Sequence, residues 1–489
     1  MFWILVQKEL KTIIQSPKFV TTFLTCSILI LLSVYVGIQD YKISLNKYAA
    51  AQSLVKNEME AASTWLELEN KIYRKPNPLQ IFSAGINNDL GRFSLISQSH
   101  DIKLESSSYS EDPIFAFFRY LDFTFIVTIV LSLFAILFTY DSVNGEKESG
   151  TLKLVFSNSI PRSTFLGAKF FGSWLGLITP ISIPILISIL FLLLFNISLT
   201  SSQWITLILY IITSFGYFTF FIALGIMFSS FTKTSSSSFL ISLVVWISFV
   251  FIIPRIGTML AGQFVDIPSL AEIESMKDSF SKAKLNEQFE KIEQLQLKRE
   301  NEMQGFSESE KEIYKEENEW EWMKEESAIT KEMQDASVQY SNKLNEEVRN
   351  KKNKMERLAL ALSRFSPASS FQLASMNMIQ TDIDLKNRAE DNLKEYKNSF
   401  VDFITKKQNK NGSGPGGIRV SLSSLTGVQV EDKRGKDKLD FTELPVFTEP
   451  ELSLANIIQP AVMDIGLIAI YIFISFGISF AAFLKFDLR

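Results

Sequence analysis

Few side chains in this sequence are suited to common enzymatic chemistry. The chain of 489 residues has one histidine, His100, and one cysteine, Cys26. Zinc, copper and iron sites are usually built from several histidine or cysteine ligands, and a serine or cysteine nucleophile usually needs a nearby base. We therefore predict no catalytic residue and no metal site of these kinds. A calcium site made of carboxylates stays open, although the sequence contains no EF-hand pattern.

Two glycine motifs resemble nucleotide-binding loops only formally. Gly412-Ser-Gly-Pro-Gly-Gly417 has the required glycine spacing, but Pro415 interrupts it and no strand leads into it. Gly435-Lys436 lacks the upstream glycine of a phosphate-binding loop. We interpret the first motif as part of a flexible linker over 408–418 and predict no nucleotide site in this chain.

The most ordered polar pattern lies between residues 141 and 169. Glu146 and Glu148 precede Gly150-Thr-Leu152, and Pro161-Arg162 follows before the chain becomes apolar. This order predicts a charged amphipathic helix, a break and a second helix. An ordinary connecting loop would explain the charge but not the order.

Long apolar runs must position these polar residues. The sequence is 47% hydrophobic yet 21% charged, which indicates apolar spans separated from polar segments. About 20 apolar residues cross a hydrocarbon core of roughly 30 Å. The sequence therefore predicts a mainly α membrane protein with an amphipathic N-terminal helix over 1–18 and six transmembrane helices, over 19–38, 118–140, 170–195, 204–228, 236–255 and 460–484.

Basic residues predict the orientation of these spans. The short segments on the side of the N-terminus carry lysine and arginine, whereas the loop 196–203 carries no charge. The positive-inside rule then places both termini and the loop 141–169 in the cytoplasm, with 39–115 and 256–458 outside. The net charge of -4 gives no indication of a nucleic-acid partner.

Sequence signals within 256–458 predict a long α-helical hairpin. Ser269-Leu-Ala-Glu272 and Ser307-Glu-Ser-Glu310 each fit a capping box at a helix start. We expect two antiparallel helices within 269–362, and a small mixed α/β or irregular outer region beside them. The hairpin either buries its own apolar seam as a coiled coil, or presents a surface that grips a partner or roofs a translocation path. Both interpretations stay open.

Four charged residues lie near the outer ends of predicted spans. Charges within a span are costly and often functional, but near the interface they can reach water. A structural pair, simple solvation and a role along a substrate path all stay open. The residues are Arg119, Asp122, Arg255 and Asp464.

At 141–169 the chain resembles the type-2 ABC exporter permeases. Their intracellular loop carries an acidic residue before a Gly-Thr-Leu core, then a proline with a basic or small residue, then glycine and lysine before the third span. The stretch 224–235 and the N-terminal Lys8-Glu9-Leu10 also fit the family. The matching loop residues are Glu146, Glu148, Gly150, Thr151, Leu152, Pro161, Arg162, Gly167 and Lys169.

The resemblance implies a permease of the bacterial cytoplasmic (inner) membrane without an ATPase site of its own. Two copies of a cytoplasmic ABC ATPase would bind ATP and Mg²⁺, and a second permease would complete a homodimer or a paralogous heterodimer in the lipid membrane. The loop would form a coupling helix that docks on the ATPase. The interface residues implied are those from Glu146 to Arg162 above, together with Lys8 and Glu9.

The long insertion between spans five and six departs from the simplest members of the family. It resembles a subgroup with large periplasmic insertions, which includes permeases linked to copper-enzyme maturation and to gliding motility. An extracytoplasmic protein is therefore a further possible partner, and the substrate stays open, as does the choice between export and mechanical work. A non-transporting membrane scaffold or sensor is the alternative function. A secondary transporter is disfavoured because no inverted repeat is evident.

Overall fold

Among the residues that the computed structural model describes, six helices are long and apolar enough to cross a membrane. The described residues are 1–62, 65, 68–97, 102–107, 121–158, 160–410, 418–423, 427–432 and 441–484. The predicted mainly α membrane protein is confirmed. The six helices are Pro17–Glu60, Phe123–Glu148, Arg162–Leu194, Ser201–Phe231, Ser235–Phe264 and Leu454–Leu484.

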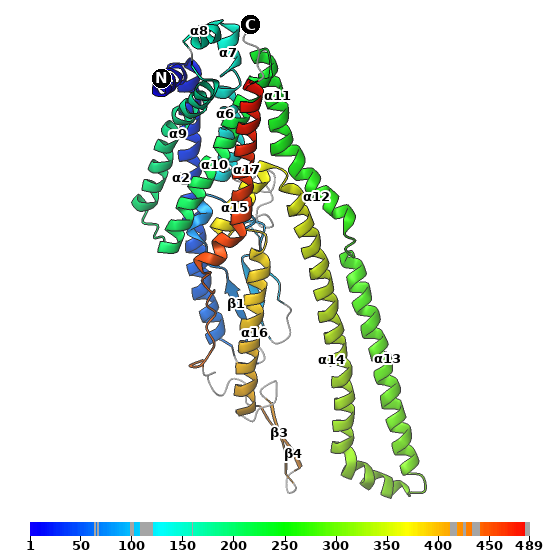
Figure 1. Cartoon of the computed structure of the whole chain (residues 1–489). Helices are drawn as coiled ribbons and strands as arrows, with labels where there is room; N and C mark the ends of the chain where they lie inside the picture. The colour runs from blue at the N-terminus through cyan, green and yellow to red at the C-terminus, as the bar shows by residue number, and fades with distance from the viewer. Residues whose placement is uncertain are drawn as a thin grey trace. The chain divides into compact units, whose positions relative to one another are not determined.

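The chain divides into two units. The bundle unit comprises residues 1–252 and 365–489, and the hairpin unit comprises 253–364. In the bundle unit, Figure 1 shows the short helices α1, α7 and α8 at one end of the long helices, with β1 and α16 toward the other. We call these the loop end and the far end. The bundle helices are α1 (Phe2–Ile14), α2 (Pro17–Glu60), α5 (Phe123–Phe125), η2 (Ile126–Leu131), α6 (Ser132–Thr139), α7 (Asn144–Glu148), α8 (Thr151–Ser157), α9 (Arg162–Leu194), α10 (Ser201–Phe231), α11 (Ser235–Ile247), η3 (Ser248–Ile252), α15 (Pro367–Ile379), α16 (Leu385–Lys410) and α17 (Leu454–Leu484).

The first span continues well beyond its apolar run. Ser16 caps α2, because its hydroxyl accepts a hydrogen bond from the Phe19 N–H at 3.2 Å, and Pro17 occupies the first helical position. Good helix formers such as Ala49-Ala-Ala51 then carry the helix to Glu60. At 1.5 Å per residue, α2 is roughly 66 Å long, about twice the thickness of a hydrocarbon core.

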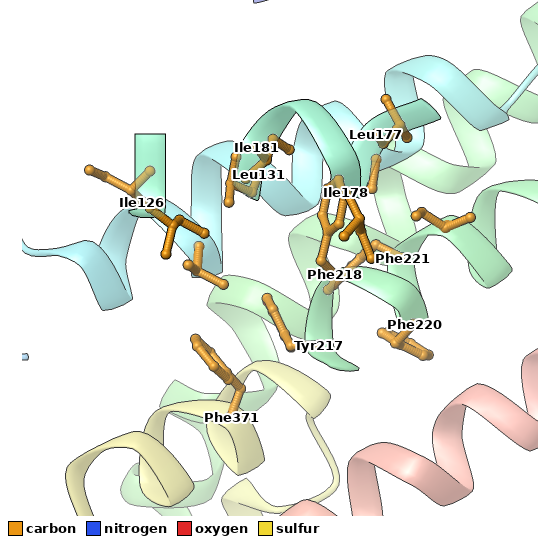
Figure 2. Packing of buried hydrophobic residues seen from close by; sticks show 14 of the residues in the cluster. Ile126, Leu131, Leu177, Ile178, Ile181, Tyr217, Phe218, Phe220, Phe221 and Phe371 are labelled. Atoms are coloured by element: carbon orange, nitrogen blue, oxygen red, sulfur yellow. The ribbon is translucent and has the colours of Figure 1, made fainter. Parts of the chain in front are cut away.

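A short buried helix, which the sequence analysis does not predict, lies among the spans. α15 packs against α10 and α17, and its Phe371 is fully buried. The Phe371 ring stacks on the Tyr217 ring with centroids 4.6 Å apart, and Figure 2 shows the two rings facing each other. The Ser366 hydroxyl caps α15 by accepting from the Ala368 N–H at 3.1 Å. Thirteen residues are too few to span a bilayer, so α15 is a buried packing helix.

The far end of the bundle unit has its own hydrophobic core, formed by two distant parts of the chain. We call it the far-end core. The ring centroids of Trp65 and Phe403 lie 5.7 Å apart, and the Asn70 amide donates to the Tyr396 hydroxyl at 2.7 Å. Its sheet pairs β1 (Asn70–Tyr73) with β2 (Phe93–Ile96) in antiparallel fashion, and η1 is Pro78–Ile81. The buried residues are Trp65, Leu68, Ile96, Leu393, Tyr396, Phe400, Phe403 and Ile404.

This core divides the chain differently from the two predicted domains, 39–115 and 256–458. Part of each predicted domain contributes to the far-end core, while the hairpin forms a separate unit. β3 (Ile418–Ser423) and β4 (Gly427–Asp432) pair as a further antiparallel hairpin. Several residues discussed above lie outside the described part of the chain: His100, Arg119, Gly412–Gly417, Gly435 and Lys436.

The hairpin unit consists of α12 (Ile253–Phe264), α13 (Leu270–Glu302) and α14 (Glu308–Ser363). Both predicted capping boxes are present, at Ser269 with Glu272 and at Ser307 with Glu310. α13 and α14 pack against each other, and the rings of Phe280 and Tyr340 stack with centroids 4.0 Å apart. The predicted hairpin over 269–362 is therefore confirmed.

Candidate functional site

The N-terminal helix α1 packs closely along the start of α9. Small residues on α9 permit this approach. A Cβ atom built on Gly172 would lie 2.7 Å from the Glu9 Cβ, and one built on Gly176 would lie 3.3 Å from the Ile13 Cδ1. Glu9 and Ile13 are both buried in this contact. The amphipathic N-terminal segment is therefore fixed to the third span.

The loop predicted to be a coupling helix folds as two short helices, α7 and α8. The chain turns between them at Gly150, whose φ of +73° favours glycine because it has no Cβ. The Thr151 hydroxyl donates to the Glu146 carbonyl oxygen at 3.2 Å and so ties the two helices together. α9 then begins at Arg162, directly after Pro161.

Two lysines and two glutamates from three elements meet beside this loop. The Lys169 ammonium lies 2.6 Å from the Glu9 carboxylate and 2.7 Å from that of Glu146, and Lys8 lies 2.9 Å from Glu146. We call these four residues the charge cluster. The Lys169 and Glu9 side chains are only 9% and 7% exposed. Burial raises the pKa of Glu9, and the neighbouring Lys169 opposes that shift.

Pairing of opposite charges makes this arrangement tolerable inside the protein. A buried ion without a partner is very costly, whereas the cluster holds equal numbers of positive and negative groups. The charge cluster joins α1, α7 and α9, so these helices are expected to move as one body. Lys8, Glu9 and Glu146 are three of the nine residues predicted for the interface, and the structure brings them together.

Glu148 points to a different partner. Its carboxylate accepts from the backbone N–H and the hydroxyl of Ser235, both at 2.8 Å, at the start of α11. Asn144, fully buried, donates its amide to the Thr232 hydroxyl at 2.6 Å, and its backbone N–H donates to the Ser229 hydroxyl at 3.2 Å. α7 is thus attached to the turn that joins α10 and α11.

Arg162 connects the same region to the last span. Its guanidinium donates to the carbonyl oxygens of Phe483, at 3.1 Å, and of Leu484, at the C-terminal end of α17. A cation at this position satisfies carbonyl groups that have no partner within the helix. The rings of Phe165 and Phe483 stack nearby with centroids 5.4 Å apart.

The two faces of α8 differ in exposure. Leu152 is 3% exposed and packs into the bundle core, so this predicted interface residue is an internal packing residue in the chain. Leu154 is 68% exposed, and its neighbours Lys153 and Ser157 are also exposed. α8 therefore presents an apolar side chain, flanked by polar ones, away from the bundle.

Some residues that hold the loop in place are not predicted from the sequence. Lys169 belongs to the family pattern but is not among the predicted site residues, and Asn144 and Ser229 have no predicted role. A lysine at the start of an apolar span is a signal of a charged partner. No comparable signal marks Asn144, because its contacts depend on a turn more than 80 residues away.

The charges predicted near the span ends have separate surroundings. Asp122 caps α5, accepting from the Phe125 N–H at 2.7 Å, and also accepts from the Ala84 N–H at 3.0 Å. Asp464 is fully buried in α17. Arg255 is exposed on α12 of the hairpin unit. Arg119 lies outside the described residues.

Comparison with known families identifies the protein class. The sequence profile of the ABC-2 family transporter proteins matches residues 3–488. The chain belongs to the ABC-2 family. No curated protein matches the sequence. An ABC-2 family protein is the membrane permease of an ABC transporter and works with a separate ABC ATPase, so the matched range makes this chain a multi-pass permease subunit.

Proposed function

We propose that this ABC-2 family protein is half of the permease of an ATP-driven exporter, and that α7 and α8 transmit ATP hydrolysis by a separate ATPase subunit to the spans. The observation that carries the proposal is the attachment of α7. Glu146 joins it to α9 and α1 through the charge cluster, and Glu148 joins it to α11.

These attachments would allow α7 to transmit motion to the spans. A short helix that is held by several spans can pass rigid-body motion to all of them. Removing one partner of a buried ion pair typically costs about 3–5 kcal/mol, so a push on α7 is expected to move α9 rather than break the contact. Arg162 extends the connection to α17. Lys8, Glu9, Glu146 and Arg162 therefore act as positioning residues in this proposal.

The ATPase would dock on the exposed face of α8. Leu154 offers an apolar contact, and Lys153 and Ser157 offer polar ones around it. ATP and Mg²⁺ would bind to the ATPase rather than to this chain. The loop end would then face the cytoplasm, as the positive-inside rule also predicts, and the far-end core and the hairpin unit would lie outside.

Six spans supply half of a pathway in this design. We propose that two permease chains, either identical or paralogous, assemble with two ATPase subunits in a bacterial inner membrane. The hairpin unit would contact an extracytoplasmic protein, and this contact would decide whether the complex exports a substrate or performs mechanical work.

Copurification tests the proposal. The full chain is tagged, extracted from its native membrane with mild detergent and captured, and the bound ATPase is quantified. Leu154→Lys should lower ATPase capture by about tenfold or more, the usual effect of losing a central interface residue. Leu297→Lys is the matched control, because Leu297 is an exposed leucine, at 53%, on the hairpin unit.

Two outcomes would contradict the proposal. Capture of no ABC ATPase by the wild-type chain would favour the membrane scaffold. Equal ATPase capture by Leu154→Lys and by the wild type would remove α8 from the docking surface.

A further inference from the structure

A groove with an apolar end and a basic end runs beside α2 in the bundle unit. It consists of two neighbouring cavities of about 320 and 290 Å³. Together they reach the size range of common small-molecule sites. The two cavities adjoin, because six residues line both of them, namely Ser44, Lys47, Gln80, Asn87, Asn88 and Arg92. We call this feature the α2 groove.

The apolar end lies along the membrane-spanning part of α2. Leu29, Leu32 and Val36 line it, and all three belong to the apolar run of the first span. Leu32 is 54% exposed and Val36 is 42% exposed, so this end opens laterally. The backbone at Ile81 packs closely against α2. A Cβ atom built on Gly37 would lie 2.7 Å from the Ile81 carbonyl oxygen. The groove is therefore bounded by backbone on one side.

The other end is basic. Lys47, Arg74, Lys75 and Arg92 line the second cavity, and none of its lining residues in the described part of the chain is acidic. Arg74 is held in place, because it donates to the Asn87 side-chain oxygen at 2.8 Å and to the Gly91 carbonyl oxygen at 3.3 Å. Lys47 lies about 16 Å along α2 from Val36, at 1.5 Å per residue.

Among the described residues, three acidic ones lie close enough to weaken this positive charge. Asp40 and Asp122 line the first cavity, but both Asp122 oxygens accept backbone hydrogen bonds, from the N–H groups of Phe125 and Ala84. Glu449 is near Arg74 and Lys75; burial raises its pKa, and these two basic neighbours oppose that rise. Within the described part of the chain, the four basic residues of this end therefore outnumber the three acids.

We propose that the α2 groove binds a membrane lipid with a phosphate-bearing, anionic head group. An acyl chain would lie along Leu29, Leu32 and Val36, and the phosphate would be bound by Lys47 and Arg92. Lysine and arginine are the common phosphate-binding side chains, and the span places the apolar end at the depth of the hydrocarbon core. Lipid binding does not depend on the proposed export function. A role for this lipid as the exported substrate would rest on that function.

Native mass spectrometry of the full chain tests this proposal. The probes are phosphatidylglycerol, zwitterionic phosphatidylcholine with the same acyl chains, and free glycerol phosphate. Phosphatidylglycerol should bind more tightly than either of the other two. Lys47→Gln/Arg92→Gln should weaken its binding by about tenfold to thirtyfold, since each basic residue contributes to the attraction of an anionic lipid. Leu32→Trp, which fills the apolar end without changing charge, should also weaken it.

The matched control is Lys56→Gln/Lys71→Gln, which removes two positive charges outside the lining of the groove and should leave binding unchanged. Equal binding of the two lipids would overturn the proposal, as would wild-type binding by the Lys47→Gln/Arg92→Gln variant. Binding of glycerol phosphate as tightly as the lipid would identify an anion site instead, and a dimer that buries Leu32 and excludes lipid would identify a subunit interface.

The same preparations are assayed for ATPase capture, so the two proposals can fail separately. Lost lipid selectivity with intact ATPase capture counts against the α2 groove alone. Intact lipid selectivity without a captured ATPase counts against the proposed function alone.

Discussion

The ammonium of Lys169, at the start of the third span, lies 2.6 Å from the carboxylate of Glu9 on the N-terminal helix. Because Glu146 shares the same ammonium at 2.7 Å, one lysine holds both α1 and α7 against α9. An amphipathic helix that lay only on the membrane surface would have no need for a buried charge. This contact makes α1 part of the bundle.

Replacing Lys169 tests the contribution of the charge cluster to stability. Lys169→Met would leave the buried Glu9 and the mostly buried Glu146 beside a single, exposed lysine, and should lower the free energy of unfolding by about 3–5 kcal/mol. The only cysteine, Cys26, is 1% exposed, so its reaction with a maleimide dye during heating reports unfolding. Adding Glu9→Gln and Glu146→Gln should restore part of the loss. Lys11→Met, at an exposed position on α1, is the control. An unchanged melting curve for Lys169→Met would mean that the cluster contributes no stability.

The close approach of α1 and α9 predicts that alanine is tolerated less well at Gly172 than at a glycine with open space around it. Gly172→Ala should destabilise the chain by about 1–3 kcal/mol, because overpacking would force α1 away from α9. Gly477→Ala on α17 has no atom within 4 Å of the added Cβ and should be neutral or slightly stabilising. The measurement is the rate of trypsin cleavage at Lys8 and Lys11. Equal cleavage rates in the two variants would contradict the packing described.

Asn144 should be more important than its neutral side chain suggests. Asn144→Ala removes amide hydrogen bonds to the Thr232 hydroxyl, at 2.6 Å, and to the Thr234 carbonyl oxygen, at 3.2 Å. At about 1 kcal/mol for each net hydrogen bond, plus the buried groups left without partners, the loss should be about 2–4 kcal/mol. Trypsin cleavage at Lys153 should accelerate as α7 loosens. Asn158→Ala, at the exposed residue that follows α8, should change this rate less, and a larger effect there than at Asn144 would contradict the prediction.

The hairpin unit should be stabilised by its own seam. The stacked rings of Phe280 and Tyr340 should show a coupling energy of about 0.5–1.5 kcal/mol in a double-mutant cycle with alanine. The measurement is helix content during thermal unfolding of the isolated fragment 253–364, which forms one unit of the chain. Phe289→Ala is the control, since Phe289 is 60% exposed. A coupling near zero would instead favour a hairpin that becomes ordered only on a partner.

Local sequence signals predict the elements whose stability is local. The spans follow from apolar run length, and the starts of α13 and α14 follow from Ser269 and Ser307 with the glutamates three residues later. The extension of α2 past residue 38 is missed because hydropathy ends there, whereas helix propensity continues to Glu60. α15 is missed because its 13 residues include three serines and no long apolar run. Its burial follows from packing against α10 and α17, which only the tertiary structure shows.

The candidate site could be predicted in part for the same reason. The loop pattern identifies Glu146, Gly150 and Arg162 from residue types and spacing. It does not reveal their partners, because Lys8 and Glu9 are 138 and 160 residues distant from the groups they contact. The resemblance to a family supplies a shared role for these residues, whereas their individual contacts require tertiary structure.

The far-end core can be completed only late in the synthesis of the chain. Asn70 and its partner Tyr396 are 326 residues apart, so Trp65 and the first strand leave the ribosome long before α16 exists. At typical rates of synthesis the delay is roughly 15–65 s. During that time this segment has half of its core missing, and it must remain available and soluble while most of the spans are inserted. A chaperone on that side of the membrane would therefore bind this incomplete segment rather than the long hairpin. The two helices of the hairpin are adjacent in sequence and can pack together soon after synthesis.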